Sequence, residues 1–347
     1  MSEQLDSLQG QSDQSGAAES IGSLAVKFDA GGFSRNKVLY ANGRMQVKVQ
    51  VVVSGLDRDG DVVAVSDEVM ESIRLIHYDS GRTLRNGWQA STEQGRFTLA
   101  VTQTATATAT ATVADDEDDG GEDSSGQRRV RTFWVSSENV ETIQIGASIK
   151  FDNTIIRSNG TTLSSRHDSS VSVEAILPVT FAVEQFRWEG VWYDGGFKNQ
   201  RIYKYYLGLY PNLQQIKLVD WIAEGADKNV VFAFGNKINA WNAAFQAGIM
   251  VRPDRQSLDV SLPFTETSGS TPDSIRDIYH EKDYEVRVND RVGELMVVQL
   301  LSPAARDQPR VDRSEVFRFT ALDQFGTEHK LAIRTDFKER SFRLERG

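Results

Sequence analysis

The feature that most constrains the fold of this chain is a period-two alternation of apolar and polar residues that recurs in short segments. In residues 45–53, an apolar side chain occupies every second position, as expected for a strand with one buried face. Such segments recur along the chain with turn residues between them, a spacing typical of β-sandwiches. Further strands are expected at 143–145, 147–151, 170–176, 179–183, 284–288, 295–300, 316–319, 330–333 and 341–344.

These segments predict a mainly β fold with two antiparallel β-sandwich domains, immunoglobulin-like or jelly-roll-like, and a few short helices. The length of 347 residues also favours two domains. Residues 1–20 are rich in Ser, Gln and Gly, a composition typical of disorder. We expect a disordered tail at 1–20, a β-sandwich domain at 21–185 with a low-complexity insertion at 102–127, and a β-rich domain at 186–347 that begins with an aromatic-rich segment.

Three segments, 66–78, 212–222 and 236–248, leave the choice between helix and strand open. Ser66 is a suitable N-cap for a short helix over 66–76. Alternatively 73–78 forms a strand, which we favour because turn residues follow it directly. Residues 236–248 can be read as a helix with one apolar side, ended by Gly248.

The segment 47–65 is predicted to be a β-hairpin with a turn at 54–61. Asp57, Asp59 and Asp61 have the spacing of the first ligands in a calcium-binding loop. However, the glycine of that loop is displaced and no glutamate stands at its last ligand position. An Asp-Gly turn accounts for the same residues with fewer requirements, so we favour the turn and keep calcium as the alternative.

This strand–DxDG–strand pattern resembles the hairpins of bacterial immunoglobulin-like modules that occur in adhesins and phage-tail appendages. The resemblance covers residues 47–65 only. It implies an exterior structural or recognition role and carries over no functional residue.

Charge and cysteine content exclude several classes of protein. The net charge is −10, from 39 basic and 49 acidic residues, and seven of the acids lie between Asp115 and Asp123. The remainder is therefore close to neutral, and no nucleic-acid partner is expected because no basic face is evident. The chain has no cysteine, which excludes disulfides, thiolate metal sites and cysteine nucleophiles.

The sequence contains no recognisable catalytic or metal-binding motif. None of the four histidines, His77, His167, His280 and His329, has another two or four residues away, as compact metal motifs require. A P-loop, a GxGxxG and a nucleophile elbow are also absent. We therefore predict no catalytic residue, no metal and no cofactor, and a protein that is not an enzyme.

Two groups of residues keep an enzymatic alternative open. The segment 164–170 contains serines beside a histidine and an aspartate, but neighbours in one loop rarely adopt the geometry of a triad. We interpret this segment as a polar loop. The other group is a set of dispersed carboxylates, Glu184 with Glu189 or Asp194, to which nothing specific assigns a reaction.

Residues 102–112 form an unusual tract in which threonine recurs at every second position and alanine fills four of the five gaps. With the acidic run and the strand that follows, this tract resembles a membrane-inserting β-hairpin over 97–135. Alanine offers little apolar area to lipid, so we favour a low-complexity hairpin or loop and keep a pore-forming or insecticidal-type toxin as the alternative. The candidate residues of this hairpin are Thr104, Thr106, Thr108, Thr110, Phe133 and Trp134.

Aromatic residues are concentrated between positions 186 and 221. Such rings form stacking surfaces for sugars, and they also fill cores where sheets meet. We favour the core, with some of the rings at a protein interface, and keep a carbohydrate-binding protein as the alternative. The candidate ligand or interface residues are Trp188, Trp192, Tyr193, Tyr205 and Tyr206.

These observations favour a non-enzymatic structural or recognition protein that assembles into a surface, virion-like or injection particle, or binds a cell surface. Its expected partners are other proteins or further copies of itself, with a glycan as an alternative and a membrane only for the toxin. The N-terminal segment lacks the basic and apolar regions of a signal peptide. We therefore expect synthesis in the cytoplasm, followed by incorporation into a particle or by release through lysis or a dedicated secretion system.

Overall fold

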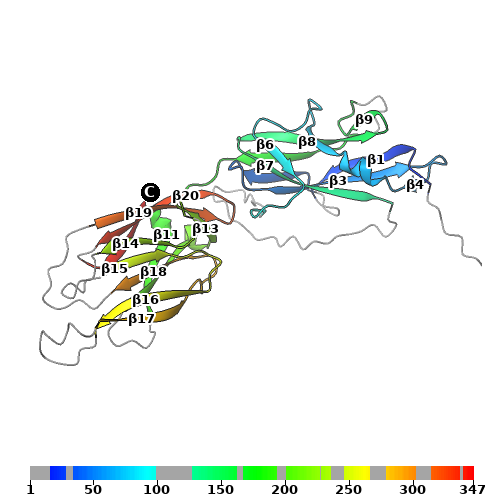
Figure 1. Cartoon of the computed structure of the whole chain (residues 1–347). Coiled ribbons are helices and arrows are strands. Elements are labelled where there is room, and N and C mark those ends of the chain that lie inside the picture. The colour runs from blue at the N-terminus through cyan, green and yellow to red at the C-terminus, as the bar shows by residue number, and fades with distance from the viewer. Residues whose placement is uncertain are drawn as a thin grey trace, which may run out of the picture. The chain divides into compact units, whose positions relative to one another are not determined.

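The computed structural model of the chain describes residues 16–28, 34–98, 127–161, 167–193, 201–226, 228–235, 246–265, 279–301, 314–336 and 339–347 (Figure 1). The fold is mainly β, which confirms the predicted fold class. The chain divides into two compact units, Met1–Pro178 and Val179–Gly347, each with its own sheets.

The first unit contains two five-stranded sheets. Contacts of β1 with β8, and of β2 with β3 and β7, place these sheets face to face as a sandwich. All strand pairs are antiparallel except β2 with β10, which are parallel and depart from the expected pattern. The first sheet has the order β1 (Ser20–Lys27), β3 (Val47–Leu56), β7 (Arg129–Ser137), β6 (Trp88–Ser91), with β4 (Val62–Val63) paired to β3. The second has the order β2 (Asn36–Tyr40), β10 (Val171–Ile176), β8 (Glu141–Phe151), β5 (Arg74–His77), with β9 (Thr154–Arg157) paired to β8.

Strand β3 shows why the alternating pattern folds in this way. Val47, Val49, Val51 and Val53 are buried, while most of the residues between them are partly exposed. Burying one valine side chain stabilises the fold by about 1.5–3 kcal/mol. The predicted hairpin is also confirmed, because β3 pairs with β4 in antiparallel register.

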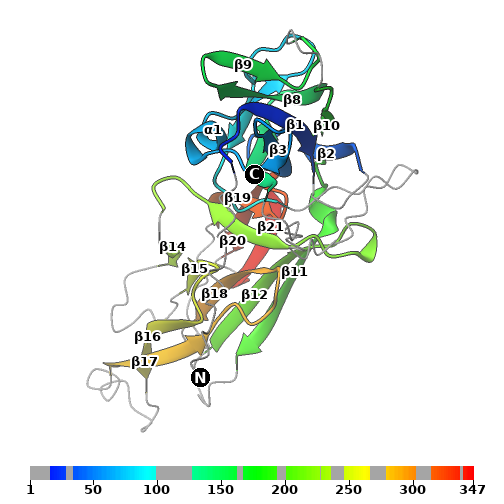
Figure 2. The same cartoon turned by 90° about the vertical axis from the view of Figure 1, so that its right-hand side faces the viewer.

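The segment 66–78 contains both a helix and a strand. Helix α1 (Asp67–Glu71) is capped by Ser66, whose hydroxyl accepts a hydrogen bond from Val69 N at 3.4 Å. The helix contacts β8 in the first unit (Figure 2). It ends early, and the strand that we favoured follows as β5.

In its described residues, the second unit contains three sheets and two short 3-10 helices. The central sheet has the order β11 (Phe186–Tyr193), β12 (Arg201–Leu209), β18 (Leu295–Leu301), β15 (Gln246–Met250), β14 (Val230–Gly235). The second sheet has the order β13 (Leu218–Ile222), β19 (Ser314–Asp323), β20 (Glu328–Asp336), β21 (Ser341–Arg346). A hairpin of β16 (Ser257–Thr265) and β17 (Tyr279–Arg287) forms the third, and the 3-10 helices are η1 (Val183–Gln185) and η2 (Pro211–Leu213).

The central sheet of this unit is covered on both faces (Figures 1 and 2). On one face, Leu207 and Val297 pack with Trp221 of the four-stranded sheet. On the other, Ile202 and Val298 belong to a cluster shared with the β16–β17 hairpin. Every residue of β18 is therefore buried, and the second unit has three layers instead of the two expected of a sandwich.

The helix predicted for 236–248 is wrong at its C-terminal end. Gln246–Met250 is strand β15, and residues 236–245 lie outside the described residues. Gly248 pairs with Gln299 of β18, and a Cβ atom at Gly248 would lie 2.5 Å from Cζ of Phe232. Glycine is needed here because an aromatic ring crosses the strand, and not because a helix ends.

The strand predicted for 179–183 is also wrong. The chain there has no regular structure until η1 begins at Val183. Oε1 of Gln185 accepts a hydrogen bond from Ala182 N at 2.9 Å. This local bond satisfies a backbone donor without a partner strand.

Candidate functional site

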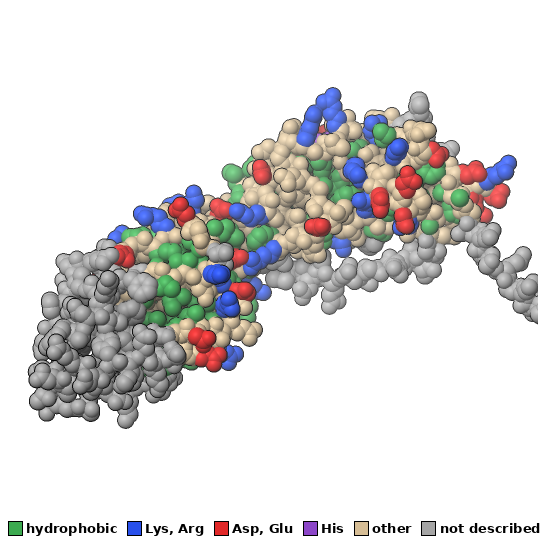
Figure 3. Space-filling model, viewed as in Figure 1, with side chains coloured by type: hydrophobic (Ala, Val, Ile, Leu, Met, Phe, Trp, Pro, Cys, Tyr) green, Lys and Arg blue, Asp and Glu red, His purple; other side chains and the backbone are tan. Residues whose placement is uncertain are grey.

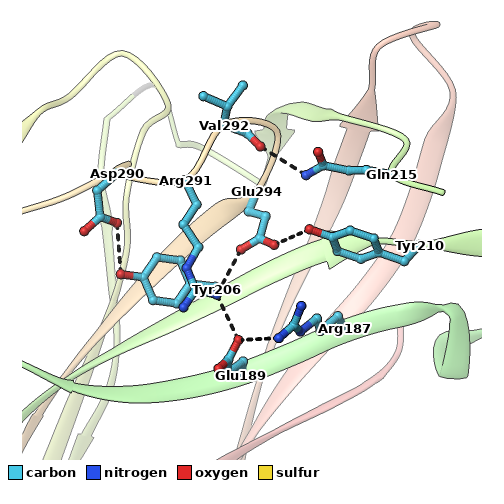
Figure 4. Close-up of polar contacts among 9 residues, drawn as sticks. All are labelled: Arg187, Glu189, Tyr206, Tyr210, Gln215, Asp290, Arg291, Val292 and Glu294. Atoms are coloured by element: carbon cyan, nitrogen blue, oxygen red, sulfur yellow. Dashed lines mark hydrogen bonds and ion pairs between the residues drawn. The ribbon is translucent and has the colours of Figure 1, made fainter. Parts of the chain in front are cut away.

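Charged and aromatic side chains from β11, β12 and two adjacent loops form a polar network at the β11 edge of the central sheet (Figure 4). Arg291 is at its centre, with Nη1 2.8 Å from Oε2 of Glu189 and 3.5 Å from Oε2 of Glu294. Nη2 of Arg187 lies 3.0 Å from the same oxygen of Glu189. The guanidinium of Arg291 also lies over the ring of Tyr206, 3.7 Å from its centroid. Such contacts stabilise a cation beyond its ion pairs.

Two tyrosines and a lysine extend the network. The hydroxyl of Tyr210 donates to Oε1 of Glu294 at 2.5 Å, and the hydroxyl of Tyr206 donates to Oδ1 of Asp290 at 2.9 Å. Nζ of Lys204 donates to Oδ2 of Asp290 at 3.0 Å. Three carboxylates are thus held by three cations and two hydroxyl donors, which fixes the rotamers of all of these side chains.

The pKa shifts in the network agree with this assignment of donors and acceptors. Burial and the hydrogen bond to Glu294 raise the pKa of Tyr210 to about 12. Burial, with the hydrogen bond to Asp290, also raises the pKa of Tyr206. Burial alone would raise the pKa of Asp290, but the hydrogen bonds from Lys204 and Tyr206 lower it below its ordinary value. The hydrogen bond from Arg291 lowers the pKa of Glu189.

Glycine at position 208 makes room for this network. Gly208 pairs with Arg187 across the β11–β12 hairpin. A Cβ atom at Gly208 would lie 2.5 Å from Cε2 of Tyr210 and 3.0 Å from Oε1 of Glu294. The hydrogen bond between Tyr210 and Glu294 therefore depends on the absence of a side chain here.

The loops 210–217 and 289–294 are fixed to each other and to the sheets. Leu218 N donates to Gly293 O at 2.9 Å, and Nε2 of Gln215 donates to Val292 O at 3.0 Å (Figure 4). Asn289 has a φ of 53° and donates through Nδ2 to the carbonyl oxygens of Arg252 and Arg255 at 2.8 and 2.7 Å. An asparagine tolerates this left-handed conformation better than most residues do.

Each of these loops exposes one apolar side chain, Leu213 at 94% and Val292 at 79%. We call these two residues the apolar tip. Asn212 and Leu213 have φ angles of 51° and 65°. A left-handed leucine costs about 1–2 kcal/mol, and here it places an apolar side chain in solvent. The sequence analysis missed the tip, although the turn residues Pro211 and Asn212 would have placed Leu213 in an exposed turn.

The candidate aromatic residues lie on both faces of the β11–β12 hairpin. Trp188 and Tyr205 pack towards the four-stranded sheet, and Tyr193 and Tyr206 pack towards the β16–β17 hairpin. Because side chains alternate along a strand, Trp192 lies on the same face as Trp188. The prediction that these rings are core residues is met by Tyr206, which is buried, whereas Trp192 is 53% exposed.

We call Trp188, Trp192, Tyr203 and Tyr205 the aromatic strip. The rings of Trp188 and Tyr205 stack at 4.9 Å between centroids, and those of Trp192 and Tyr203 lie 5.9 Å apart. Nε1 of Trp188 donates to Phe342 O at 3.2 Å.

The residues proposed for a membrane hairpin are only partly described. Thr104, Thr106, Thr108 and Thr110 lie outside the described residues. Phe133 is 4% exposed and belongs to the core of the first unit, while Trp134 is partly exposed on the other face of β7. Since β7 is paired on both sides, with β3 and β6, releasing Phe133 to a membrane would open this sheet.

The catalytic-looking segments have local structural roles. His167 is buried, the carboxylate of Asp168 accepts a hydrogen bond from the hydroxyl of Tyr78, and residues 162–166 lie outside the described residues. Of the dispersed carboxylates, Glu189 is bound by two arginines, Glu184 lies in η1, and Asp194 is not among the described residues.

The segment that resembles a calcium-binding loop, around Asp57, forms a turn closed by its own hydrogen bonds. Oδ1 of Asp57 accepts hydrogen bonds from the backbone of Asp59 at 3.0 Å and of Asp61 at 2.9 Å. In the part of the chain that the structure describes, no three histidine or acidic side chains gather to hold a metal ion.

Comparisons with known proteins give a distant structural similarity. No protein-family model and no curated protein sequence matches the chain. The C-terminal domain of the Streptococcus pyogenes antigen I/II-family protein AspA is similar with 11% sequence identity, over 89% of this chain and 97% of that chain, at a TM-score of 0.23. A similarity this low does not establish a shared fold. No helix among the described residues is long and apolar enough to span a membrane.

Proposed function

We propose that this chain is a non-enzymatic recognition protein that binds a protein partner through the apolar tip of its second unit. The observation that carries the proposal is Leu213, an apolar residue that is held in a left-handed conformation and is 94% exposed. Single exposed apolar residues are common on protein surfaces. A strained one is not, because strain persists only where the surrounding structure enforces it.

The polar network supplies the rigidity that a binding tip needs. Binding is weakened by the loss of side-chain and loop freedom, so loops fixed in advance bind more tightly. Here Leu218 and Gln215 hold the 289–294 loop, and Tyr210 joins Glu294 of that loop to the start of η2. The tip is therefore presented in one conformation before any partner arrives.

The surroundings of the tip suit a protein surface with an apolar pocket. The side chains of Arg187 and Glu189 on β11 are 59% and 37% exposed. An apolar centre with a polar rim of both signs is the usual arrangement of protein–protein interfaces. In the view of Figure 3, the described part of the second unit exposes apolar side chains with basic and acidic ones among them.

The test is Leu213→Gly in the full chain, because stability and binding should change in opposite directions. Relief of the left-handed strain should gain about 1–2 kcal/mol. This exceeds the cost of roughly 0.5–1 kcal/mol that the greater freedom of glycine in the unfolded chain brings, so the midpoint of urea unfolding should rise. Binding of the partner should weaken by about tenfold or more, since the burial of a leucine side chain, about 1.5–3 kcal/mol, is lost. Ile155→Ala is the matched control, because Ile155 is 51% exposed on β9 of the first unit.

The partner is identified in two steps. Native mass spectrometry over a wide concentration range shows whether a second copy of the chain is the partner. If it is not, the wild-type chain recovers the partner from its natural source, and the purified partner is titrated against each variant. Equal affinity of Leu213→Gly and the wild type for that partner would overturn the proposal.

A further inference from the structure

We infer that Asn86 in the first unit is a site of spontaneous covalent modification, at which the side-chain amide is lost and aspartate or isoaspartate forms. The chain contains three asparagine–glycine pairs, which begin at Asn42, Asn86 and Asn159. Glycine after asparagine favours this reaction because no Cβ atom stands beside the backbone nitrogen that attacks. The structure leaves the amide of Asn86 free and holds the other two.

The reaction is intramolecular and needs only water besides the chain. The backbone nitrogen of Gly87 loses its proton to hydroxide and attacks Cγ of Asn86. A bond forms between these two atoms, the bond from Cγ to Nδ2 breaks, and Nδ2 takes a proton from water and leaves as ammonia. Water then opens the five-membered ring. Opening at Cγ gives aspartate, and opening at the backbone carbonyl carbon gives isoaspartate, in which the main chain runs through the side chain.

Asn86 and Gly87 form an exposed turn directly before β6. Their φ angles are 58° and 84°, as in the type I′ turns that asparagine–glycine pairs favour. The bond that closes the turn, from Trp88 N to Arg85 O, is 3.4 Å long. Among the described residues, neither the side chain of Asn86 nor the backbone nitrogen of Gly87 forms a hydrogen bond. The attacked carbon and the attacking nitrogen are therefore both free to move.

A neighbouring amide makes the attacking nitrogen more reactive. Nδ2 of Asn139 donates to Asn86 O at 2.8 Å, the carbonyl oxygen of the peptide group that contains the nitrogen of Gly87. A donor at this oxygen polarises the peptide group, so its N–H loses the proton more readily. The reaction starts with that loss.

The pair that begins at Asn42 is held by hydrogen bonds on both reacting groups. Oδ1 of Asn42 accepts from Arg44 N at 2.9 Å and from Met45 N at 2.8 Å. The attacking nitrogen, Gly43 N, donates to Ser137 O at 2.9 Å. Each of these bonds has to break before the ring can close, which raises the barrier.

The pair that begins at Asn159 is held in the same way. Nδ2 of Asn159 donates to Tyr78 O at 2.8 Å, and its Oδ1 accepts from Oγ1 of Thr161 at 2.6 Å. Gly160 N donates to His167 O at 3.1 Å. The three pairs thus have the same local sequence motif and differ in how the fold holds them.

The inference is tested by ageing the full chain in warm, mildly alkaline buffer and mapping amide loss by peptide mass spectrometry. In the folded chain, Asn86 should react at least about tenfold faster than Asn42 or Asn159, which corresponds to about 1.4 kcal/mol in activation free energy. In urea the three rates should come close together, because the hydrogen bonds are gone. A purified isoaspartate methyltransferase should label the aged wild type far more than aged Asn86→Gln, since glutamine would have to form a larger ring.

Conversion should also loosen the start of β6. Isoaspartate lengthens the main chain of the turn just before Trp88, whose side chain is buried and donates through Nε1 to Oε2 of Glu141 at 3.2 Å. Hydrogen exchange of residues 88–91 should therefore be faster in the aged wild type than in aged Asn86→Gln. Equal exchange in samples that contain isoaspartate would overturn this consequence.

Two outcomes would overturn the inference itself. One is amide loss in the folded chain that is no faster at Asn86 than at Asn42 and Asn159. The other is a lead of Asn86 that persists unchanged in urea, because neighbours in the sequence, and not the free turn, would then set its rate.

Discussion

The two faces of the β11–β12 hairpin are built from alternate residues of the same strands, yet different interactions organise them. On one face, Glu189 and Tyr206 belong to a network of ion pairs and hydrogen bonds centred on Arg291. On the other, Trp188 and Tyr205 are held by ring stacking. Each face depends on one glycine that leaves room for a ring, Gly208 for the network and Gly190 for the strip.

This difference follows from what lies over each face. The face with the network is joined by the 289–294 loop, which brings Asp290, Arg291 and Glu294 to the hairpin. The face with the strip packs against Phe342 of β21, whereas Trp192 on the same face is 53% exposed. The two faces of one hairpin can therefore differ in chemistry without any change in backbone structure. A substitution on one face should accordingly change stability through the contacts of that face alone.

The largest expected effect is on the aromatic face, from Gly190→Ala. The new Cβ would lie 2.9 Å from Cε1 of Tyr205, and the ring cannot retreat freely because Trp188 and Phe342 pack against it. We expect a loss of about 1–3 kcal/mol, measured by urea unfolding. In a Tyr205→Ala background the same change should cost little; an unchanged cost there would show that the ring is not the cause.

A somewhat smaller effect is expected on the polar face, from Arg291→Met. This change keeps much of the apolar stem but leaves the carboxylate of Glu294, whose side chain is 5% exposed, without its cation. Because Arg291 itself is 35% exposed, solvent screens part of the loss, and we expect about 1–2 kcal/mol. If Arg291→Lys is as unstable as Arg291→Met, geometry rather than charge holds the network.

Lowering the pH should have a smaller effect on stability, and it should act through the carboxylates of the polar face. The folded-state pKa values of Asp290 and Glu189 are lowered, so both carboxylates stabilise the fold above their unfolded values of about 3.9 and 4.3. This stabilisation is lost as the pH falls through the folded values. Unfolding midpoints measured from pH 6 to about pH 3 should therefore fall less steeply for Asp290→Asn than for the wild type. Trp192→Ala should keep the full wild-type slope.

The smallest effect on stability is expected from Trp192→Ala itself. Trp192 is 53% exposed, and surface substitutions usually change stability by less than about 0.5 kcal/mol. A thermal melt should therefore be nearly unchanged. A drop of several kcal/mol would instead mean that Trp192 belongs to the core.

The sequence predicts much of the fold because alternation is a local signal. Strand β3 can be identified from its valines alone. The same rule also separates the aromatic candidates, since adjacent residues such as Tyr205 and Tyr206 cannot share a face of a strand. Applied to residues 186–206, the rule would have assigned the candidate aromatic residues to the two faces on which the structure places them.

The polar network could not be predicted in this way. Arg291 and Glu189 are distant in sequence and meet only because β12 lies between β11 and β18 in the sheet. Nothing in the local pattern of either residue indicates the other. The mistaken helix at 246–248 has a similar origin, because the ring that requires Gly248 comes from Phe232 on β14.

Strand β18 has a consequence for how its sheet is aligned. A strand with one apolar face resists a one-residue slip, because the slip would bury its polar side chains. In β18 both faces are apolar, so hydrophobic pattern alone barely distinguishes one alignment from the next. Gln299 is the exception, since its Nε2 donates to Arg340 O at 3.1 Å in the β20–β21 turn. The side-chain amide of Gln299 thus fixes the register of a strand whose apolar residues would allow others.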